Sequence, residues 1–321
     1  MREPATKQAV APRRVSATVA ALVLLTSALW GGTPVAIRYS VESFPPVAIA
    51  ACRFATAALF MIVWCHFERT SLRLRRGQVR LVCVAGVLLF LQIFLFNQGV
   101  ARSNASHGAM HINTFVFWVV TIEHFFTKAD RLTSRKLAGL LLAAVGVAVV
   151  LTTAPADVRS VDSPNLTGDL LLLLSACILG IKIVFIKQAL RHVEPGKLVF
   201  WHAVVGLVLF SAYSLAFEPF PSVPPTTNAV LGILYQGIFV AGLCFAIQTT
   251  LLRKHSASQI SVFAFTTPLF GVTLAVLMRN DHLSPWLFLS AACVAVGILL
   301  ANQNTRNAGQ DARPASEALD D

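Results

Sequence analysis

The chain has 321 residues, of which 56% are hydrophobic and only 13% are charged, and its mean hydropathy is +0.69. A soluble domain carries about 25% charged residues, so this composition excludes a soluble protein and predicts an integral membrane protein. The formal net charge of +11 does not indicate nucleic-acid binding, because the basic residues lie in short loops between apolar runs, where membrane topology accounts for them.

The first apolar run follows the basic pair Arg13-Arg14 and continues through Trp30 to Pro34. It lacks an A-x-A-like cleavage site and many apolar runs follow it, so it is predicted to be a transmembrane helix rather than a signal peptide. A membrane span needs about 20 apolar residues. Ten segments have this character: 17–37, 46–66, 80–100, 105–127, 135–152, 168–190, 197–217, 229–251, 257–279 and 284–301.

The segments outside these runs predict the domain organisation. The polar tails, 1–16 and 302–321, are expected to be disordered and cytoplasmic. The longest connection, 153–167, is rich in Asp, Ser and Pro and is the natural linker between a first half, 17–152, and a second half, 168–301.

The distribution of Lys and Arg tests this count of spans. With the N-terminus inside, 20 of the 26 basic residues fall in inside segments and 4 in outside segments, while Arg53 and Lys182 lie within spans. This asymmetry agrees with the positive-inside rule. It predicts an all-α integral membrane protein with ten transmembrane helices and with both termini in the cytoplasm.

The two halves repeat each other in sequence. A shift of 149 residues places Gly31 on Gly180, and a shift of 151 places Gly86 on Gly237. Each half holds five spans, an odd number, so the second half is expected to enter the membrane in the opposite sense. Such inverted repeats are typical of secondary transporters, which bind substrate near the membrane midplane where the repeats meet.

The fourth span, 105–127, is unusually polar. On a helix of about 100° per residue, one face carries His107, His111, Thr114 and Trp118. Polar groups in a bilayer turn toward protein or a wet cavity, so this face is predicted to line a central pathway that binds substrate or takes up protons. Neutral histidines satisfied by a neighbouring helix are the alternative.

No H-E-x-x-H motif and no second histidine cluster accompany this pair of histidines, so neither a metal site nor a cofactor is expected. Glu123 and His124, near the inner end of the same span, are interpreted as an interfacial structural pair.

Lys182 lies in the middle of the sixth span, where the first span has Thr33. A charge at the bilayer centre costs roughly 2.5–3.5 kcal/mol on insertion scales. Lys182 is therefore predicted to anchor an anionic or carboxylate-bearing substrate, or else to form a structural pair or to snorkel toward an interface. Arg53 and His202 occupy matching positions in the second and seventh spans, and Arg53 either contacts substrate or snorkels outward.

Other polar and aromatic residues of the spans complete the predicted site. Polar side chains here either hydrogen-bond between helices or offer donors and acceptors to a ligand. Trp30 lies inside its span rather than in the interfacial belt, so it either encloses substrate or only packs. The predicted substrate-binding residues are Trp30, Thr33, Asn97, His107, His111, Thr114, Trp118, Lys182, Gln248, Thr266 and Thr267.

Small residues recur at intervals of four in the fifth and tenth spans. Gly139 and Ala143 in the one, with Gly297 and Ala301 in the other, form small-x-x-x-small faces. Such faces suit close helix packing, either within the chain or in a homodimer.

Several motifs recur in matching places of the two halves or mark their helices. They are Leu29-Trp30-Gly31, Pro46 with Arg53-Phe54, Asp130-Arg131-Leu132-Thr133 with Gly139 and Gly146, Phe265-Thr266-Thr267-Pro268-Leu269, and Asp281-His282-Leu283-Ser284 with Gly297. Together they resemble the EamA family of the drug/metabolite transporter superfamily. The resemblance covers about residues 17–301. It implies a ten-helix inner-membrane transporter of metabolites, often outward, with a cavity lined by the first, third and fourth helices of each half. Because Phe117 stands where the second half has Pro268, the fourth helix is expected to be straighter than the ninth.

The predicted function is secondary transport of a small polar metabolite, an amino acid or a related compound, outward across the cell (inner) membrane by alternating access. The alternatives are a channel-like or structural membrane protein and a membrane-embedded enzyme. No Walker loop, G-x-S-x-G elbow or paired catalytic carboxylate is present in the sequence, which argues against an ATP-driven pump and a serine hydrolase. No catalytic residue is predicted.

Overall fold

The computed structural model describes residues 16–41, 43–102, 111–128, 131–153, 166–219, 224–279 and 285–303. Every regular element in these ranges is helical. The predicted tails and linker lie largely outside the described residues. The elements of the first half are α1 (Ala17–Gly31), α2 (Thr33–Val41), α3 (Pro46–Phe67), α4 (Arg76–Arg102), α6 (Phe115–Ile122) with a π-helical turn (Glu123–Thr127), and α7 (Ser134–Thr153).

The second half has α8 (Leu166–Ala189) and α9 (Pro195–Phe217), then α10 (Thr227–Leu234), a π-helical segment (Tyr235–Cys244) and α11 (Phe245–Lys254) as one continuous rod. The chain ends in α12 (Ala257–Ser261), a 3₁₀ segment (Val262–Thr266), α13 (Thr267–Arg279) and α14 (Pro285–Gln303). Proline at the first turn of α3 and of α9 suits a position whose N–H needs no helical partner.

Five helices in the described residues are long and apolar enough to cross a membrane: Pro46–Phe67, Arg76–Gly99, Leu166–Ala189, Pro195–Phe217 and Thr227–Lys254. Shorter apolar helices lie at Ala17–Gly31, Phe115–Thr127 and Ala292–Ala301. An all-helical membrane architecture agrees with the sequence prediction. The count of ten spans and the cytoplasmic placement of both termini stay predictions.

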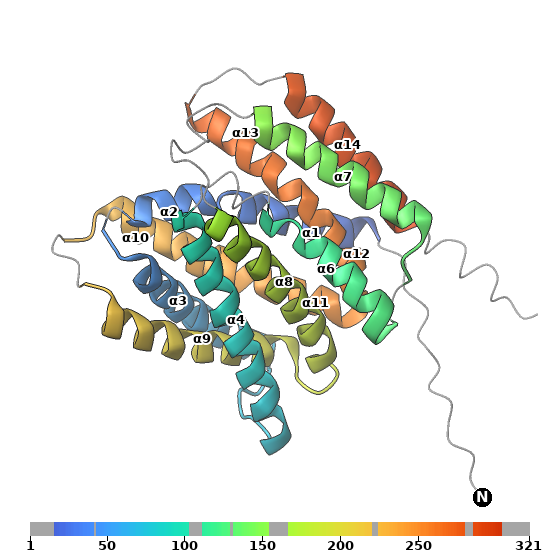
Figure 1. Ribbon diagram of the computed structural model, residues 1–321. Helices are drawn as coiled ribbons and strands as arrows, with labels where there is room; N and C mark the ends of the chain where they lie inside the picture. The colour runs from blue at the N-terminus through green and yellow to red at the C-terminus, as the bar shows by residue number, and fades with distance from the viewer. Residues whose placement is uncertain are drawn as a thin grey trace, which may run out of the picture.

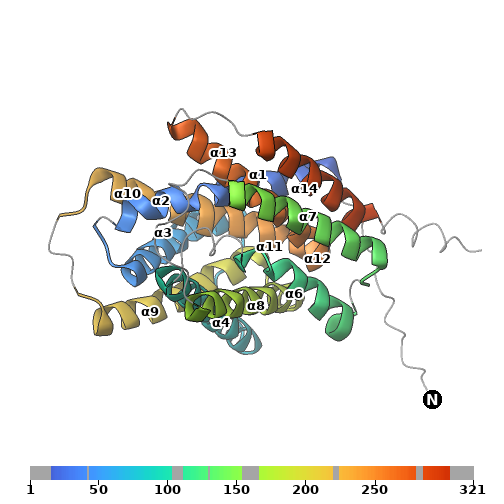
Figure 2. The same ribbon diagram turned by 45° about the horizontal axis from the view of Figure 1, so that its top comes forward.

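The helices pack in pairs that correspond under the sequence repeat. α4 packs against α8 in the first pairing, and their equivalents α10 and α2 pack against each other in the same way. Likewise α6 packs against α8, and their equivalents α13 and α1 pack against each other. α3 packs against its own counterpart α9, and α7 against α14. In Figures 1 and 2, α7, α13 and α14 lie together at one side of the bundle and α9 lies at the opposite side.

The small residues of α7 and α14 are used inside the chain. A Cβ atom added to Gly139 would lie 2.6 Å from the carbonyl oxygen of Gly297, and one added to Gly297 would lie 2.6 Å from that of Gly139. The backbones of the two helices therefore touch along this line, which confirms the expected close packing. A homodimer stays a prediction, and this face is already occupied by the chain's own partner helix.

Four of the predicted spans, the first, fourth, eighth and ninth, are not continuous α-helices. The first is interrupted at Gly32, where the Tyr235 hydroxyl donates to the carbonyl of Leu29 at 2.7 Å. A side chain at Gly32 would collide with that hydroxyl, at 2.5 Å. The ninth changes to 3₁₀ geometry before Pro268, which has no N–H to donate to the preceding turn.

The fourth span is interrupted as well, although it was expected to be straighter than the ninth. Asn113 and Thr114 form a turn before α6, and the Thr114 hydroxyl donates to the His111 carbonyl at 2.6 Å. A threonine hydroxyl can compete with the backbone ladder for a carbonyl, so a helix is broken here without any proline. The absence of proline at Phe117 did not predict the backbone geometry.

Candidate functional site

The ring of Phe245, at the start of α11, is the meeting point of side chains from three other helices. The Trp30 ring from α1 approaches it edge-on, with centroids 6.4 Å apart. The His202 ring from α9 stacks on it at 5.7 Å, and the Lys182 ammonium from α8 lies 5.6 Å from its centroid. We call Trp30, Lys182, His202 and Phe245, with Gln92 and Arg53 described next, the central cluster.

Lys182 is almost completely buried, with 4% of its surface exposed. Its ammonium donates to the side-chain oxygen of Gln92 on α4 at 3.0 Å. The Ser175 hydroxyl on α8 donates to the backbone carbonyl of Gln92 at 2.8 Å. An amide oxygen satisfies one N–H of the ammonium but does not neutralise its charge.

Two more basic side chains lie in this region. Arg53 on α3 is within electrostatic range of Lys182, and its guanidinium carbon lies 5.5 Å from the Phe54 ring centroid. The Arg53 Nε is buried and has no hydrogen-bond partner among the described residues. His202, 1% exposed, has its Nδ1 3.0 Å from the Leu198 carbonyl oxygen. A carbonyl only accepts, so Nδ1 carries a proton.

The carboxylates of the described residues are engaged elsewhere. Asp169 pairs with His111 at 3.5 Å, and Glu194 pairs with Lys197 at 3.2 Å. Glu123 and Glu218 bind backbone N–H groups, and Glu68 lies beside Gly196 at the end of α3. Among the described residues, therefore, no carboxylate forms an ion pair with Lys182 or Arg53, and the central cluster has an excess of positive charge.

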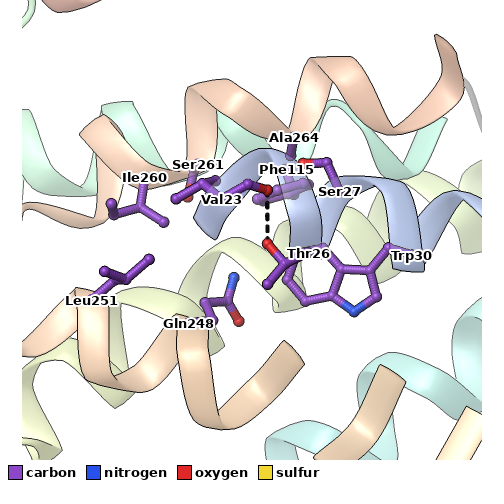
Figure 3. A pocket seen from close by; sticks show the side chains of 10 residues that line it. All are labelled: Val23, Thr26, Ser27, Trp30, Phe115, Gln248, Leu251, Ile260, Ser261 and Ala264. Carbon is purple, nitrogen blue, oxygen red and sulfur yellow. Dashed lines mark hydrogen bonds between the residues drawn. The ribbon is translucent and has the colours of Figure 1, made fainter. Parts of the chain in front are cut away.

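A small cavity adjoins this cluster (Figure 3). Its volume is about 10 Å³, room for about one water molecule. Gln248 on α11 faces Thr26 and Trp30 on α1 across it, and Trp30 belongs to both the cavity wall and the central cluster. The lining residues are Val23, Thr26, Ser27, Trp30, Phe115, Gln248, Leu251, Ile260, Ser261 and Ala264.

The structure brings together only some of the predicted site residues. Trp30 and Lys182 meet at Phe245, and Gln248 lines the adjoining cavity. Thr33 follows the interruption at Gly32, and its hydroxyl is buried without a hydrogen-bond partner among the described residues. The Thr266 hydroxyl donates to the Phe263 carbonyl at 2.7 Å, so it is satisfied within its own turn.

Asn97 and Thr267 are half-buried, on α4 and at the start of α13. The polar residues of the fourth span lie apart from the central cluster. His111 pairs with Asp169 at the start of α8, and Trp118 is 40% exposed beside Gly180. Thr114 precedes α6 and bonds locally to His111. His107 lies outside the described residues, so the predicted continuous polar wall is not formed by the residues that are described.

Glu123 has the structural role that was predicted for it, but not at an exposed interface. Its side chain is 1% exposed. Its two carboxylate oxygens accept the backbone N–H groups of Ala257 at 2.9 Å and Ser258 at 2.8 Å. A carboxylate at a helix N-terminus satisfies orphan N–H groups and complements the helix dipole, so Glu123 fastens the end of α6 to the start of α12.

Sequence reasoning missed Phe245 and did not select Gln92, Arg53 or His202. Phe245 is one of 22 phenylalanines in an apolar chain, and nothing in its local sequence marks it. Arg53 and His202 carried a usable signal, because basic residues recur at matching positions of two spans.

Comparison with known proteins now decides the family. The profile of the EamA-like transporter family matches residues 17–152 and again residues 166–303. The chain belongs to this family. With its apolar helices, it is a multi-pass membrane protein of a transporter family, as the sequence motifs indicated.

Several proteins similar to this EamA-family chain are named transporters. A Bacillus subtilis protein named "Uncharacterized transporter YoaV" is 22% identical, over 87% of this chain and 94% of its own length. An Escherichia coli protein named "Probable amino-acid metabolite efflux pump" is 24% identical, over 87% and 93%. A solved structure titled only "Crystal structure of protein" matches with a TM-score of 0.76 at 20% identity, over 88% of this chain and 98% of that one, and it supports the fold alone.

Proposed function

We propose that this EamA-family protein is a secondary transporter that exports a small polar metabolite, an amino acid or a related compound, across the cell membrane by alternating access. The observation that carries the proposal is the central cluster. Gln92, Lys182 and His202 of this cluster are buried where helices of both halves meet, which is where inverted-repeat carriers bind substrate. The name of the Escherichia coli relative supports both the outward direction and the substrate class.

The same arrangement supports ten spans in two inverted repeats. The family profile matches each half separately, and equivalent helices of the two halves make equivalent contacts, as α4 with α8 and α10 with α2. A two-fold axis in the membrane plane relates such repeats in transporters. It would pass between α3 and α9 and between α7 and α14, because these pairs join equivalent helices.

Substrate entry requires movement of the helices. The cavity beside Trp30 holds about one water molecule, so a metabolite fits only after neighbouring helices separate. The interruption at Gly32, the π-helical segment Tyr235–Cys244 and the 3₁₀ segment Val262–Thr266 flank the central region. We propose that these irregular segments absorb the changes in backbone angles, because hinges are formed by a few residues at element ends.

Counterflow in proteoliposomes tests the proposal. Vesicles loaded with an unlabelled amino-acid mixture are diluted into a trace of the same labelled amino acids. A carrier is expected to accumulate label transiently and to saturate, whereas a channel gives flux that is linear in substrate and no overshoot. Flux of the second kind, or none above protein-free vesicles, contradicts the proposal.

A matched pair of variants locates the site. Phe245→Ala removes the ring at the centre of the cluster and is expected to reduce counterflow at least about tenfold, because several contacts are lost together. Phe67→Ala removes a ring that is 80% exposed at the end of α3 and is expected to leave counterflow unchanged. Equal rates in the two variants would place the pathway elsewhere.

A further inference from the structure

We propose that the substrate of this protein carries a carboxylate on an apolar body, and that its carboxylate binds between Lys182 and Arg53 against the Phe245 ring. This inference rests on the proposed transport function and names the substrate class of the same site. Its basis is a charge imbalance that the described residues do not correct.

Two other buried or half-buried lysines show how this chain compensates a structural cation. Lys187 donates to the carbonyls of Leu252 and His255 at the end of α11. The carbonyls at a helix C-terminus carry partial negative charge, so they suit an ammonium group. Lys197 has the carboxylate of Glu194.

Lys182 differs from these lysines in its surroundings. Its only hydrogen-bond partner among the described residues is the neutral Gln92 side chain, and another cation, Arg53, lies within electrostatic range. Only 4% of its surface is exposed, so it does not snorkel to an interface. A buried charge is unfavourable unless an opposite charge and hydrogen bonds compensate it.

Arg53 supplies a second, independent indication of a missing anion. Its Nε is buried and without a partner among the described residues, although a guanidinium is suited to bind a carboxylate through two N–H groups. A carboxylate at this position would accept from the Lys182 ammonium, and the positive charge of Arg53 would favour it. The Gln92 side-chain oxygen, which accepts from Lys182 at 3.0 Å, would then share the ammonium with the carboxylate.

The aromatic rings around Lys182 indicate what kind of group the rest of the ligand carries. Trp30 and His202 flank Phe245 edge-on and face-on, so apolar ring surface adjoins the charged groups. An apolar or planar body against these rings is favourable, whereas an ammonium group without a carboxylate would be repelled by Lys182 and Arg53. The site therefore favours a carboxylate over its amide and over the corresponding amine.

Binding to the purified full-length protein tests this without any transport step. Thermal unfolding in detergent is measured with sodium acetate, benzoate and phosphate, and with the uncharged acetamide and benzamide and the cationic benzylamine. We expect a concentration-dependent rise in the unfolding midpoint with benzoate, a smaller rise with acetate, and no rise with the amides or the amine. A rise with phosphate alone, with the amides equally, or with none of the probes overturns the proposed carboxylate class.

Substitution of Lys182 provides a second test of the proposed carboxylate site. Lys182→Met keeps the length and apolar stem but removes the charge, and it is expected to weaken benzoate binding at least about tenfold. Lys254→Met, at an exposed lysine of α11, is the control and is expected to bind benzoate as the wild type does. Equal binding by wild type and Lys182→Met would also refute the proposal.

The ligand-free protein separates a binding role from a structural one. An uncompensated buried charge destabilises the unliganded state, so Lys182→Met is expected to unfold at the same temperature as the wild type or higher. A lower midpoint would identify the contact with Gln92 as a structural pair and would overturn the inference. Benzoate binding without counterflow would contradict the transport proposal but not this site, whereas counterflow without carboxylate binding would contradict only the site.

Discussion

The buried carboxylate of Glu123 offers the sharpest test of how this fold is held together. Both of its oxygens accept backbone N–H groups of the first turn of α12, at 2.9 and 2.8 Å, and the side chain is 1% exposed. Lys187, on α8, lies within electrostatic range. Glu123→Gln keeps the shape of the side chain but replaces one acceptor oxygen by an NH₂ donor that faces another donor.

The magnitude follows from these two bonds. A hydrogen bond to a charged group contributes about 1.5–3 kcal/mol, and a buried donor left without an acceptor costs a similar amount. Glutamine retains one of the two bonds, so Glu123→Gln is expected to destabilise the protein by about 2–3 kcal/mol. For a chain of this size, that corresponds to a fall of roughly 4–12 °C in the midpoint of thermal unfolding.

Glu194→Gln is the matched control for Glu123→Gln. Glu194 is 51% exposed and pairs with Lys197 at 3.2 Å, and an exposed pair contributes about 0–1 kcal/mol. The midpoint of each purified variant is measured in the same detergent by intrinsic fluorescence. If both variants unfold within 1–2 °C (about the size of a surface effect) of the wild type, the bidentate cap does not fasten α6 to α12 and the reasoning is refuted.

The remaining predictions concern other close contacts of the fold. Gly139→Ala places a Cβ atom 2.6 Å from a backbone oxygen of α14 and is expected to destabilise the protein by about 1–3 kcal/mol; Gly77→Ala, with nothing within 4 Å, is the control and should be neutral in the same unfolding assay. Glu218→Gln weakens the part-buried cap of α3, where the carboxylate accepts two backbone N–H groups at 2.8 and 2.9 Å. It is expected to lower the free energy of unfolding by about 1–2 kcal/mol, less than Glu123→Gln does. The reverse order would contradict the role of burial. Tyr235→Phe removes the hydrogen bond to the Leu29 carbonyl at 2.7 Å and is expected to lower the free energy of unfolding by about 1 kcal/mol. An unchanged midpoint of thermal unfolding would show that this hydroxyl does not stabilise the interruption after α1.

Part of the candidate site could be predicted from the sequence alone. Lys182 stands out because a charge inside a long apolar run has no lipid-facing position, and that argument needs no coordinates. Trp30 was noticed for its depth in the first span, and it does contact the ring next to Lys182. Phe245 and Gln92 were not distinguished, because their importance lies in contacts with helices that are distant in sequence.

The fourth span shows where helical periodicity failed. His111, Thr114 and Trp118 share a face only if the helix is unbroken, and the turn at Asn113–Thr114 interrupts it. A local hydroxyl-to-carbonyl bond produces no strong pattern in the sequence, because threonine also occurs within regular helices. Glu123 was interpreted as an interfacial structural residue, and its burial could not be predicted because its partners are the N–H groups of a helix that begins 134 residues later.

The sequence by itself determined that this chain is an all-helical membrane protein of the EamA family in two similar halves. Hydrophobic length and motif order along the chain carry that information, and both are local properties. The tertiary structure decided which polar groups meet, which of them are satisfied, and where the helices are interrupted. Those outcomes depend on packing between helices that are far apart in the chain, as in the contact of Phe245 with Trp30, Lys182 and His202.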